Sequence, residues 1–499
     1  MISRWWLAAS LVVGVTVGWL ALPGGRRPVD IAQLRPQGLI AAPARAALDV
    51  RDHGAVGDGV TDDRAAIQAT LAAAAQGDTV TLPIGTYIVG QGAGVWCLTI
   101  PAGVTLHGES RDGTVLLMAP GIAGSVRLLQ IDAPGVTVED LTLDGNRAAQ
   151  TADEHRAGVF STAADTVIRR VTARAFTGDG FYFYGGADRF VVDHALSIWH
   201  GRNGMTVGGA VAGGRVTDSQ FFDSHAQQFD SEPGSAAVIS WLTITGCTFD
   251  GRGHSTDYVL TVSGGSPAAR ARDWLIAGNV INGGLHAVWA DRITVRGNTG
   301  VNLTGHPHIS FYRSCADNVI EDNQGLDSSA PNILGTINLT ATGEGGPVRT
   351  VIRRNRLVSD TFAIRAEGGS SVEIYDNELV GPGSASPGAG IYLRATDAAK
   401  PFAHTVVRRN RIVNFGSVAV KVDGNGSAAL SLLDLQDNVL VDSAGTMLGG
   451  YALNNDGQGA ARVIRESGTV MLGGCVHKLV GAAPAGAASG GTDQSWVVP

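Results

Sequence analysis

Five similar phrases in the middle of the 499-residue chain bring acidic, basic and phenolic side chains to repeated positions: GDGFYFYG, GRNGMTVG, AQQFDSEPG, STDYVLTV and GLHAVWAD. Side chains alternate along a strand, so the phrases predict that Phe181, Met205 and Phe229 point inward. Asp230 and Glu232 then share the outer face. Two carboxylates at i and i+2 have Cβ atoms about 7 Å apart, and their repulsion favours a proton, a cation or a substrate beside them.

The same alignment predicts a catalytic set and a substrate-binding set. Asp257 and His286 follow Asp230 at intervals of about one coil each, which places them on neighbouring coils. The predicted catalytic residues are Asp230, Glu232, Asp257, His286 and Tyr182. The predicted substrate-binding residues are Tyr184, Arg202, His200, His225, Gln228 and Trp289.

One chemistry for such a set is removal of the proton next to a uronate carboxylate, as in a polysaccharide lyase or a C5-epimerase. That reaction needs a base, an acid and a group that neutralises the carboxylate. His286 or His225 would be the base, Tyr182 the acid and Arg202 the neutralising group. We expect lyase or epimerase chemistry ahead of hydrolysis.

Hydrolysis is the alternative reaction. A glycoside hydrolase needs two carboxyl groups flanking the glycosidic bond, one of them with a raised pKa. Asp230, Glu232 and Asp257 offer these groups. A third alternative is a non-catalytic carbohydrate-binding or surface protein, because solenoids form extended binding faces without catalysis.

The elements that would align these residues are the coils of a solenoid. A phrase of the form I/V-x-x-N-x-hydrophobic recurs every 19 to 33 residues, with its asparagines at Asn279, Asn298, Asn323, Asn355, Asn377, Asn410 and Asn438. Ser219 and Cys247 occupy the same position upstream. One asparagine per coil predicts a stacked, buried ladder rather than ligands. The arginine pairs before this position, such as Arg353 and Arg354, are expected on solvated faces.

The segment DVRDHGAVGDGVTDDRAAIQATLAAAAQGDTVTLPIGTYIVG predicts a strand, a glycine-rich turn, a short apolar helix and a strand pair. Thr61 is the expected N-cap of the helix, and the helix would cover the open end of the solenoid. Residues 49–90 resemble the N-terminal segment of the pectate-lyase-like β-helix superfamily, which has rhamnogalacturonase-like and epimerase-like members. The resemblance implies an all-β, right-handed parallel β-helix with an N-terminal capping helix, and it identifies the fold better than the reaction.

The FDSE phrase resembles a short signature of mannuronan C5-epimerase-like and alginate-lyase-like β-helices. In those proteins an Asp and a following acid line the cleft, and an Asp and a His follow from later coils. The residues that match by type are Asp230, Glu232, Asp257 and His286. Gln227 stands where the family has a tyrosine, so a phenolic proton donor would come from Tyr182, Tyr184 or Tyr258. The chain has no GHG or RIK phrase, which disfavours a polygalacturonase-type hydrolase.

Composition agrees with an exported solenoid. Sixty-nine glycines, 44% hydrophobic and 16% charged residues favour short strands and tight turns. A net charge of −8 without a basic run argues against nucleic acid as a partner and leaves a polysaccharide as the expected one. The four cysteines form no CxxC pair and are expected in the core. No cofactor is predicted; calcium would fit, but the sequence has no dedicated loop for it.

The expected organisation has four parts. Residues 1–22 are a signal peptide or membrane anchor, residues 23–47 a linker, residues 48–450 the β-helix and residues 451–499 a C-terminal extension with a low-complexity tail. The apolar N-terminus is the only expected membrane contact. The predicted location is secreted, periplasmic or cell-surface.

Overall fold

The computed structural model describes residues 46–252, 258–302, 306–328, 334–342, 345–369, 371–384, 388–395, 402–424, 432–447, 449–455, 462–474, 479–480 and 494–498. Residues 1–44 and 45–499 are two separate units, and the fold described below is that of the second. The predicted leader and nearly all of the predicted linker lie outside the described residues. In the part of the chain that the structure describes, we find no helix with the length and apolar character needed to cross a bilayer.

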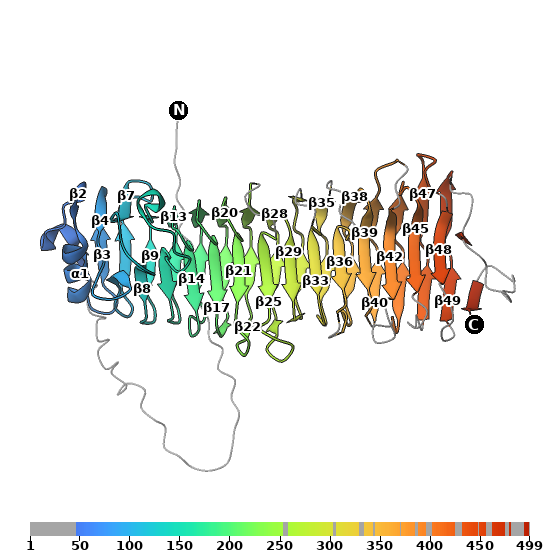
Figure 1. The fold of residues 1–499 in the computed structure, drawn as a ribbon, viewed down its shortest axis with the longest axis horizontal. Coiled ribbons are helices and arrows are strands. Elements are labelled where there is room, and N and C mark those ends of the chain that lie inside the picture. Colours follow the sequence, from blue (N-terminus) through green and yellow to red (C-terminus); the bar gives the residue numbers. More distant parts are fainter. Residues whose placement is uncertain are drawn as a thin grey trace, which may run out of the picture. The chain divides into compact units, whose positions relative to one another are not determined.

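The short strands wind into a solenoid in which successive coils add strands in parallel to three long faces (Figure 1). Among the described residues, sheet A has 17 strands and begins with β1 (Ala47–Asp49); only β52 (Gln494–Val498) pairs antiparallel, with β49 (Arg462–Ser467). Sheet B has nine and begins with β2 (Asp58–Asp62); the seven-stranded sheet E, from β32 (Val301–Asn302), continues it. A four-stranded sheet D begins with β18 (Val211–Ala212). The predicted parallel β-helix is confirmed.

Sheet C carries the candidate site. Its 15 strands pair in parallel from one coil to the next. They are β5 (Trp96–Thr99), β8 (Arg127–Ile131), β11 (Val159–Ser161), β14 (Phe181–Tyr184), β17 (Met205–Gly208), β21 (Phe229–Glu232), β25 (Leu260–Ser263), β29 (Leu285–Val288), β33 (Ile309–Tyr312), β36 (Ile337–Thr340), β39 (Phe362–Glu367), β42 (Ala389–Ala395), β45 (Val418–Gly424), β48 (Gly449–Asn455) and β51 (Leu479–Val480). The pairing of β45, β48 and β51 shows that the coils continue past residue 450.

The predicted capping helix is α1 (Arg64–Ala73), which lies at the N-terminal end of the solenoid (Figure 1). Ile67 and Leu71 are fully buried, so its apolar face covers the first coil. The expected N-cap was wrong: Thr61 lies in β2, and Asp63 precedes the helix. The Asp63 carboxylate instead accepts hydrogen bonds from the backbone N–H groups of the glycine-rich turn at residues 56 and 57, at 2.6 and 3.0 Å.

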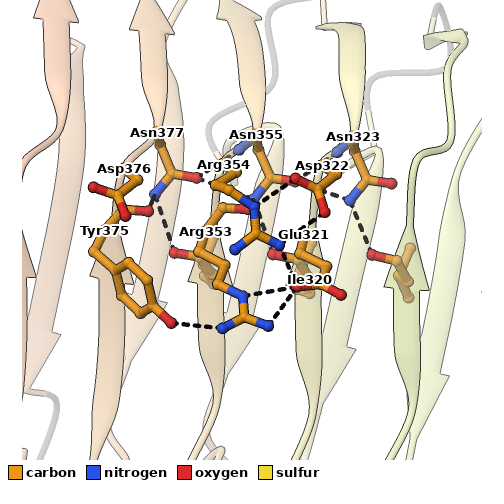
Figure 2. A network of polar contacts seen from close by, with 12 residues as sticks. Ile320, Glu321, Asp322, Asn323, Arg353, Arg354, Asn355, Tyr375, Asp376 and Asn377 are labelled. Atoms are coloured by element: carbon orange, nitrogen blue, oxygen red, sulfur yellow. Dashed lines mark hydrogen bonds and ion pairs between the residues drawn. The ribbon is translucent and has the colours of Figure 1, made fainter.

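The asparagine ladder is confirmed as a structural device. The side-chain amide of Asn323 donates to Asn355 Oδ1 at 2.9 Å, and that of Asn355 donates to Asn377 Oδ1 at 3.0 Å (Figure 2). Each amide also bonds a backbone carbonyl, as Asn355 does with Ile320 at 2.9 Å. From Asn279 to Asn438 the ladder satisfies buried backbone groups at one corner of each coil, and this explains one asparagine per coil in that part of the chain.

The arginines beside the ladder are engaged by acids on adjacent coils. Arg354 bonds both carboxylate oxygens of Asp322, at 2.7 and 2.8 Å, and Arg353 bonds Glu321 (Figure 2). These ion pairs are partly exposed, as expected for a solvated face. Cys97, Cys247 and Cys315 are buried, free thiols, which confirms their place in the core.

Candidate functional site

The outer face of sheet C carries the residues predicted to do chemistry. Phe181 and Phe229 are fully buried and lie in one register through Met205, as predicted. Tyr182 and Asp230 follow them in sequence and therefore point outward. Parallel strands lie about 4.8 Å apart, so two strand steps separate these two residues by about 10 Å.

An ion-pair network joins the two predicted acids to a third. Arg202 Nη1 lies 2.9 Å from Asp179 Oδ2, and Arg202 Nη2 bonds Glu232 Oε1. Asp179 also accepts hydrogen bonds from the backbone N of Asn203 at 3.0 Å and from the Thr206 hydroxyl at 2.9 Å. Burial raises the pKa of Asp179 to about 6, and the Arg202 charge opposes this shift. Two protein carboxylates thus hold the guanidinium of Arg202.

Asp230 lies at the centre of this network. Its Oδ1 accepts a hydrogen bond from the Thr261 hydroxyl, and its Oδ2 accepts one from Asn203 Nδ2 at 3.3 Å. Burial raises the pKa of Asp230 to about 7; the Thr261 hydroxyl opposes the shift and the negative charge of Glu232 adds to it. A carboxyl group that titrates near neutral pH is suited to giving or taking a proton in a reaction.

An aromatic cluster flanks the acids on the N-terminal side. Tyr182 packs edge-on against Phe160 and Tyr184, with ring centroids 5.3 and 6.0 Å apart. Burial, together with the negative charge of Glu232, raises the pKa of Tyr182 to about 12, so its hydroxyl stays protonated. Gly208 makes room for the rings: a Cβ there would lie 2.9 Å from Tyr184 Cδ2 and 3.0 Å from the Tyr182 hydroxyl.

His286 lies on the other side of the acids. Thr261 pairs with His286, so His286 is two strand steps, about 10 Å, from Asp230 rather than on the adjacent strand. The imidazole stacks on Tyr258 with centroids 4.4 Å apart. Thr261 occupies the outward position between Asp230 and His286, where Asp257 was expected; Asp257 itself lies outside the described residues.

Two predicted substrate-binding residues are interior. His200 is fully buried; it bonds the Ser197 hydroxyl at 2.9 Å and accepts from the Phe176 backbone N at 3.3 Å. Burial lowers the pKa of His200 to about 3. Gln228 is also buried and bonds the backbone N and O of Ser224 at 3.2 and 3.1 Å. Because both side chains are enclosed, their placement fits the support of turns rather than contact with a polymer.

Two others lie at the corners of the solenoid. His225 lines a separate pocket of about 530 Å³ with Trp199 and Arg147, where sheet B strands lead into sheet C. His225 Nε2 is 3.2 Å from Arg147 Nη2. Trp289 follows β29, and Cζ of the Arg313 guanidinium lies 4.0 Å from the centroid of the Trp289 ring. The structure therefore groups Tyr184 and Arg202 with the acids, but not these two residues.

The sequence argument missed Asp179, although a signal was present. Asp179, Asn203, Gln227 and Tyr258 each stand two residues before an inward residue of sheet C. The backbone N of Gln227 donates to Asn203 Oδ1 at 3.0 Å, as that of Asn203 does to Asp179, so these positions form a second polar ladder. Tyr258 therefore occupies the ladder position one coil after Gln227. The aligned phrases already contain this column, so comparing the residues two positions before each inward residue would have found Asp179 and Asn203 beside Gln227 and Tyr258.

Among the described residues, two groups of histidine and acidic side chains come close enough to share a cation: His107 with Glu139 and Asp140, and Asp193 with His194 and Asp218. Both groups lie along sheet A rather than on the outer face of sheet C. Asp140 already forms an ion pair of 2.5 Å with Arg170.

Comparison with known proteins places this geometry in context. Residues 47–139 match the family model described as "Rhamnogalacturonase A/epimerase, pectate lyase-like". Mannuronan C5-epimerase AlgE1 of Azotobacter vinelandii is 38% identical over 148 residues, which are 27% of this chain and 10% of that protein. Alginate lyase 7 of the same bacterium is 39% identical over 108 residues, 20% of this chain and 13% of the lyase. The chain thus spans a small part of these relatives.

A solved structure, the A-module of mannuronan C5-epimerase AlgE6 of Azotobacter vinelandii, aligns with 85% of this chain and 99% of the module. The sequence identity is 20% and the TM-score 0.45. Residues 47–139 are therefore similar to the rhamnogalacturonase A/epimerase, pectate lyase-like family, and about a quarter of the chain is similar in sequence to mannuronan C5-epimerases.

Proposed function

We propose that this chain is an enzyme that removes the C5 proton of a uronate unit in a polysaccharide, as a lyase or a C5-epimerase. The observation that supports this most is the stripe on sheet C, in which Asp230 lies between Tyr182 and His286 in one register. Two of the relatives that share sequence with the chain are named for mannuronan and alginate, which are uronate polymers.

Loss of the C5 proton leaves negative charge that spreads onto the neighbouring carboxylate, so the site must hold that carboxylate in a form that accepts the charge. Asp230, protonated below about pH 7, is suited to donating a hydrogen bond to it. Arg202 was the predicted neutralising group, but its Nη1 and Nη2 atoms already bond Asp179 and Glu232. We assign the neutralising role to Asp230, and to Arg202 the role of positioning the acids.

Proton transfer then needs a base and an acid that both lie on the outer face of sheet C. We assign the base to His286, whose ordinary pKa lies near neutral pH, and the acid to Tyr258, whose ring centroid lies 4.4 Å from that of the imidazole. Tyr182 is four strand steps, or about 19 Å, from His286, which is too far for both residues to act on one C5 atom. In an epimerase, the acid returns a proton to C5 from the opposite side. In a lyase, the C4–O bond breaks instead, the leaving oxygen takes the proton and a C4–C5 double bond forms.

Hydrolysis is the second candidate, and the Asp230–Glu232 pair is the observation that favours it. A hydrolase uses one carboxylic acid with a raised pKa and one carboxylate. Asp230 meets the first requirement. Glu232 meets the second less well, because Arg202 bonds its carboxylate and lowers its availability as a base or nucleophile.

The test is incubation of the full chain with polymannuronate, polygalacturonate and a neutral glucan. The absorbance of the C4–C5 double bond, the number of reducing ends and the exchange of C5 protons in deuterated water are followed together. Double bonds with new reducing ends indicate a lyase, and exchange alone indicates an epimerase. Reducing ends alone would establish the hydrolase, and no change on any polymer would contradict an enzymatic role on these substrates.

Variants then connect the reaction to the stripe. Asp230→Asn replaces an acidic O–H donor by the much weaker N–H donor of an amide, and His286→Gln removes the base. We expect each variant to lower kcat by about 10²-fold or more, the usual scale for a lost base or a lost hydrogen bond to developing charge. The matched control is His194→Asn, because His194 is exposed and pairs with Asp193 on sheet A. Equal rates in Asp230→Asn and the natural protein would remove the acid cluster from the mechanism.

A further inference from the structure

A second polar cluster lies on the same outer face of sheet C, three strands beyond His286. From His286 the register runs through Ser310 and Asn338 to Arg365 on β39. The strands that carry these residues, β29, β33, β36 and β39, lie side by side in Figure 1. Arg365 is therefore five strand steps from Asp230, or about 24 Å along the same face.

Arg365 is a buried cation without a full set of partners. Its side chain is 9% exposed, its Nη1 donates to Asn338 Oδ1 at 3.2 Å and its Nη2 bonds Glu367. Its Nε has no hydrogen-bond partner among the residues that the structure describes. Glu367 also receives Arg394 Nη1 at 3.1 Å, so two guanidinium groups share one carboxylate. The cluster carries one positive charge in excess.

This cluster borders a pocket of about 300 Å³. Tyr312 and His286, whose rings are tilted with centroids 5.8 Å apart, form an aromatic side of the pocket, while Asn338 and Thr340 supply polar groups. Aromatic rings offer a large apolar surface to the apolar face of a sugar, and a guanidinium forms strong, charge-assisted hydrogen bonds with a carboxylate. An anionic group that enters the pocket would supply the hydrogen-bond partner that this buried arginine lacks.

We propose that the Arg365 end of this pocket is a subsite for a uronate unit, with the Arg365 cluster holding its carboxylate, while His286 at the other end of the pocket belongs to the reaction site. The proposal rests on the function proposed above for the outer face of sheet C. A polymer bound at both Asp230 and Arg365 must span the distance of about 24 Å between these two residues. The subsite would therefore select long anionic chains over short or neutral ones.

The test is calorimetric binding of long oligomannuronate, mannuronate trimer and a neutral glucan oligosaccharide to the full chain. We expect Arg365→Gln to raise the Kd for the long oligomer about tenfold or more, the effect of losing one charge-assisted contact. The trimer, which can reach the acid cluster alone, should keep its Kd and its kcat. The matched control is Arg356→Gln, since Arg356 is an exposed arginine on β38 (Arg356–Ser359) of sheet E.

A second variant covers a failure of Arg365→Gln to fold. Asn338→Asp keeps the shape of the side chain, pairs with Arg365 and cancels the excess charge, so it should weaken the long oligomer selectively. An unchanged Kd for the long oligomer in both variants overturns the subsite, as does an equal loss for the neutral glucan. Arg365-dependent binding without turnover of any uronate polymer would support the subsite and contradict only the proposed reaction.

Discussion

Replacing Asp230 by asparagine should stabilise the protein while it removes activity. The pKa of Asp230 is raised from 3.8 to about 7 in the folded state, so the folded protein favours the neutral carboxyl group. Stability due to this group is therefore lost as pH rises from about 4 to about 7, because the unfolded chain releases the proton first. Asparagine mimics the neutral form, and its single oxygen can still accept from one of the two donors that bond Asp230, Thr261 or Asn203.

The size of the effect follows from the shift. About three pKa units correspond to about 4 kcal/mol in favour of Asp230→Asn at pH 8, and the Thr261 hydrogen bond and the coupling to Glu232 reduce this to about 2–4 kcal/mol. At about pH 4 the difference should be below about 1 kcal/mol. Urea unfolding of both proteins at the two pH values measures it.

The control is Asp165→Asn. Asp165 forms an exposed ion pair with Arg189 at 2.7 Å, so its loss should cost less than about 1 kcal/mol. An Asp230→Asn variant that is no more stable than the natural protein at pH 8, or that gains equally at both pH values, would refute the assignment of a neutral carboxyl group at the site.

Three further outcomes follow from the structure. Gly208→Ala should displace the Tyr182 ring, which lies 3.0 Å from the added Cβ, and lower kcat with little change in melting temperature; unchanged kinetics would argue against a role for the ring. Asn355→Ala should lower the free energy of unfolding by about 3–5 kcal/mol, because several buried groups lose their hydrogen-bond partners. The control Arg356→Ala removes an exposed ion pair and should cost less than about 1 kcal/mol. Urea unfolding measures both. The pKa of His200 is lowered to about 3, so its imidazole should show no titration by NMR between about pH 5 and pH 8. The stability that the neutral imidazole contributes is lost only as the pH falls below about 6.5, the ordinary pKa of histidine in the unfolded chain.

The outward register of the site could be predicted because it depends on local alternation. Phe181 and Phe229 had to point inward, so Tyr182 and Asp230 had to point outward, and the structure confirms both. The role of Arg202 could not be predicted, because its partner Asp179 comes from the preceding coil. Nothing in either phrase alone shows that an arginine and an aspartate 23 residues apart meet.

The sequence by itself determined the solenoid, its asparagine ladder and the two faces of its strands, since these follow from a period of two within a strand and one buried amide per coil. Only the tertiary structure decided which residues meet between coils. Loop lengths vary from coil to coil, so the spacing along the chain could not show that Thr261 lies beside Asp230. In the turns at the corners, side chains do not alternate regularly between inside and outside. The sequence therefore could not show that His200 is buried while His225 lies at the surface.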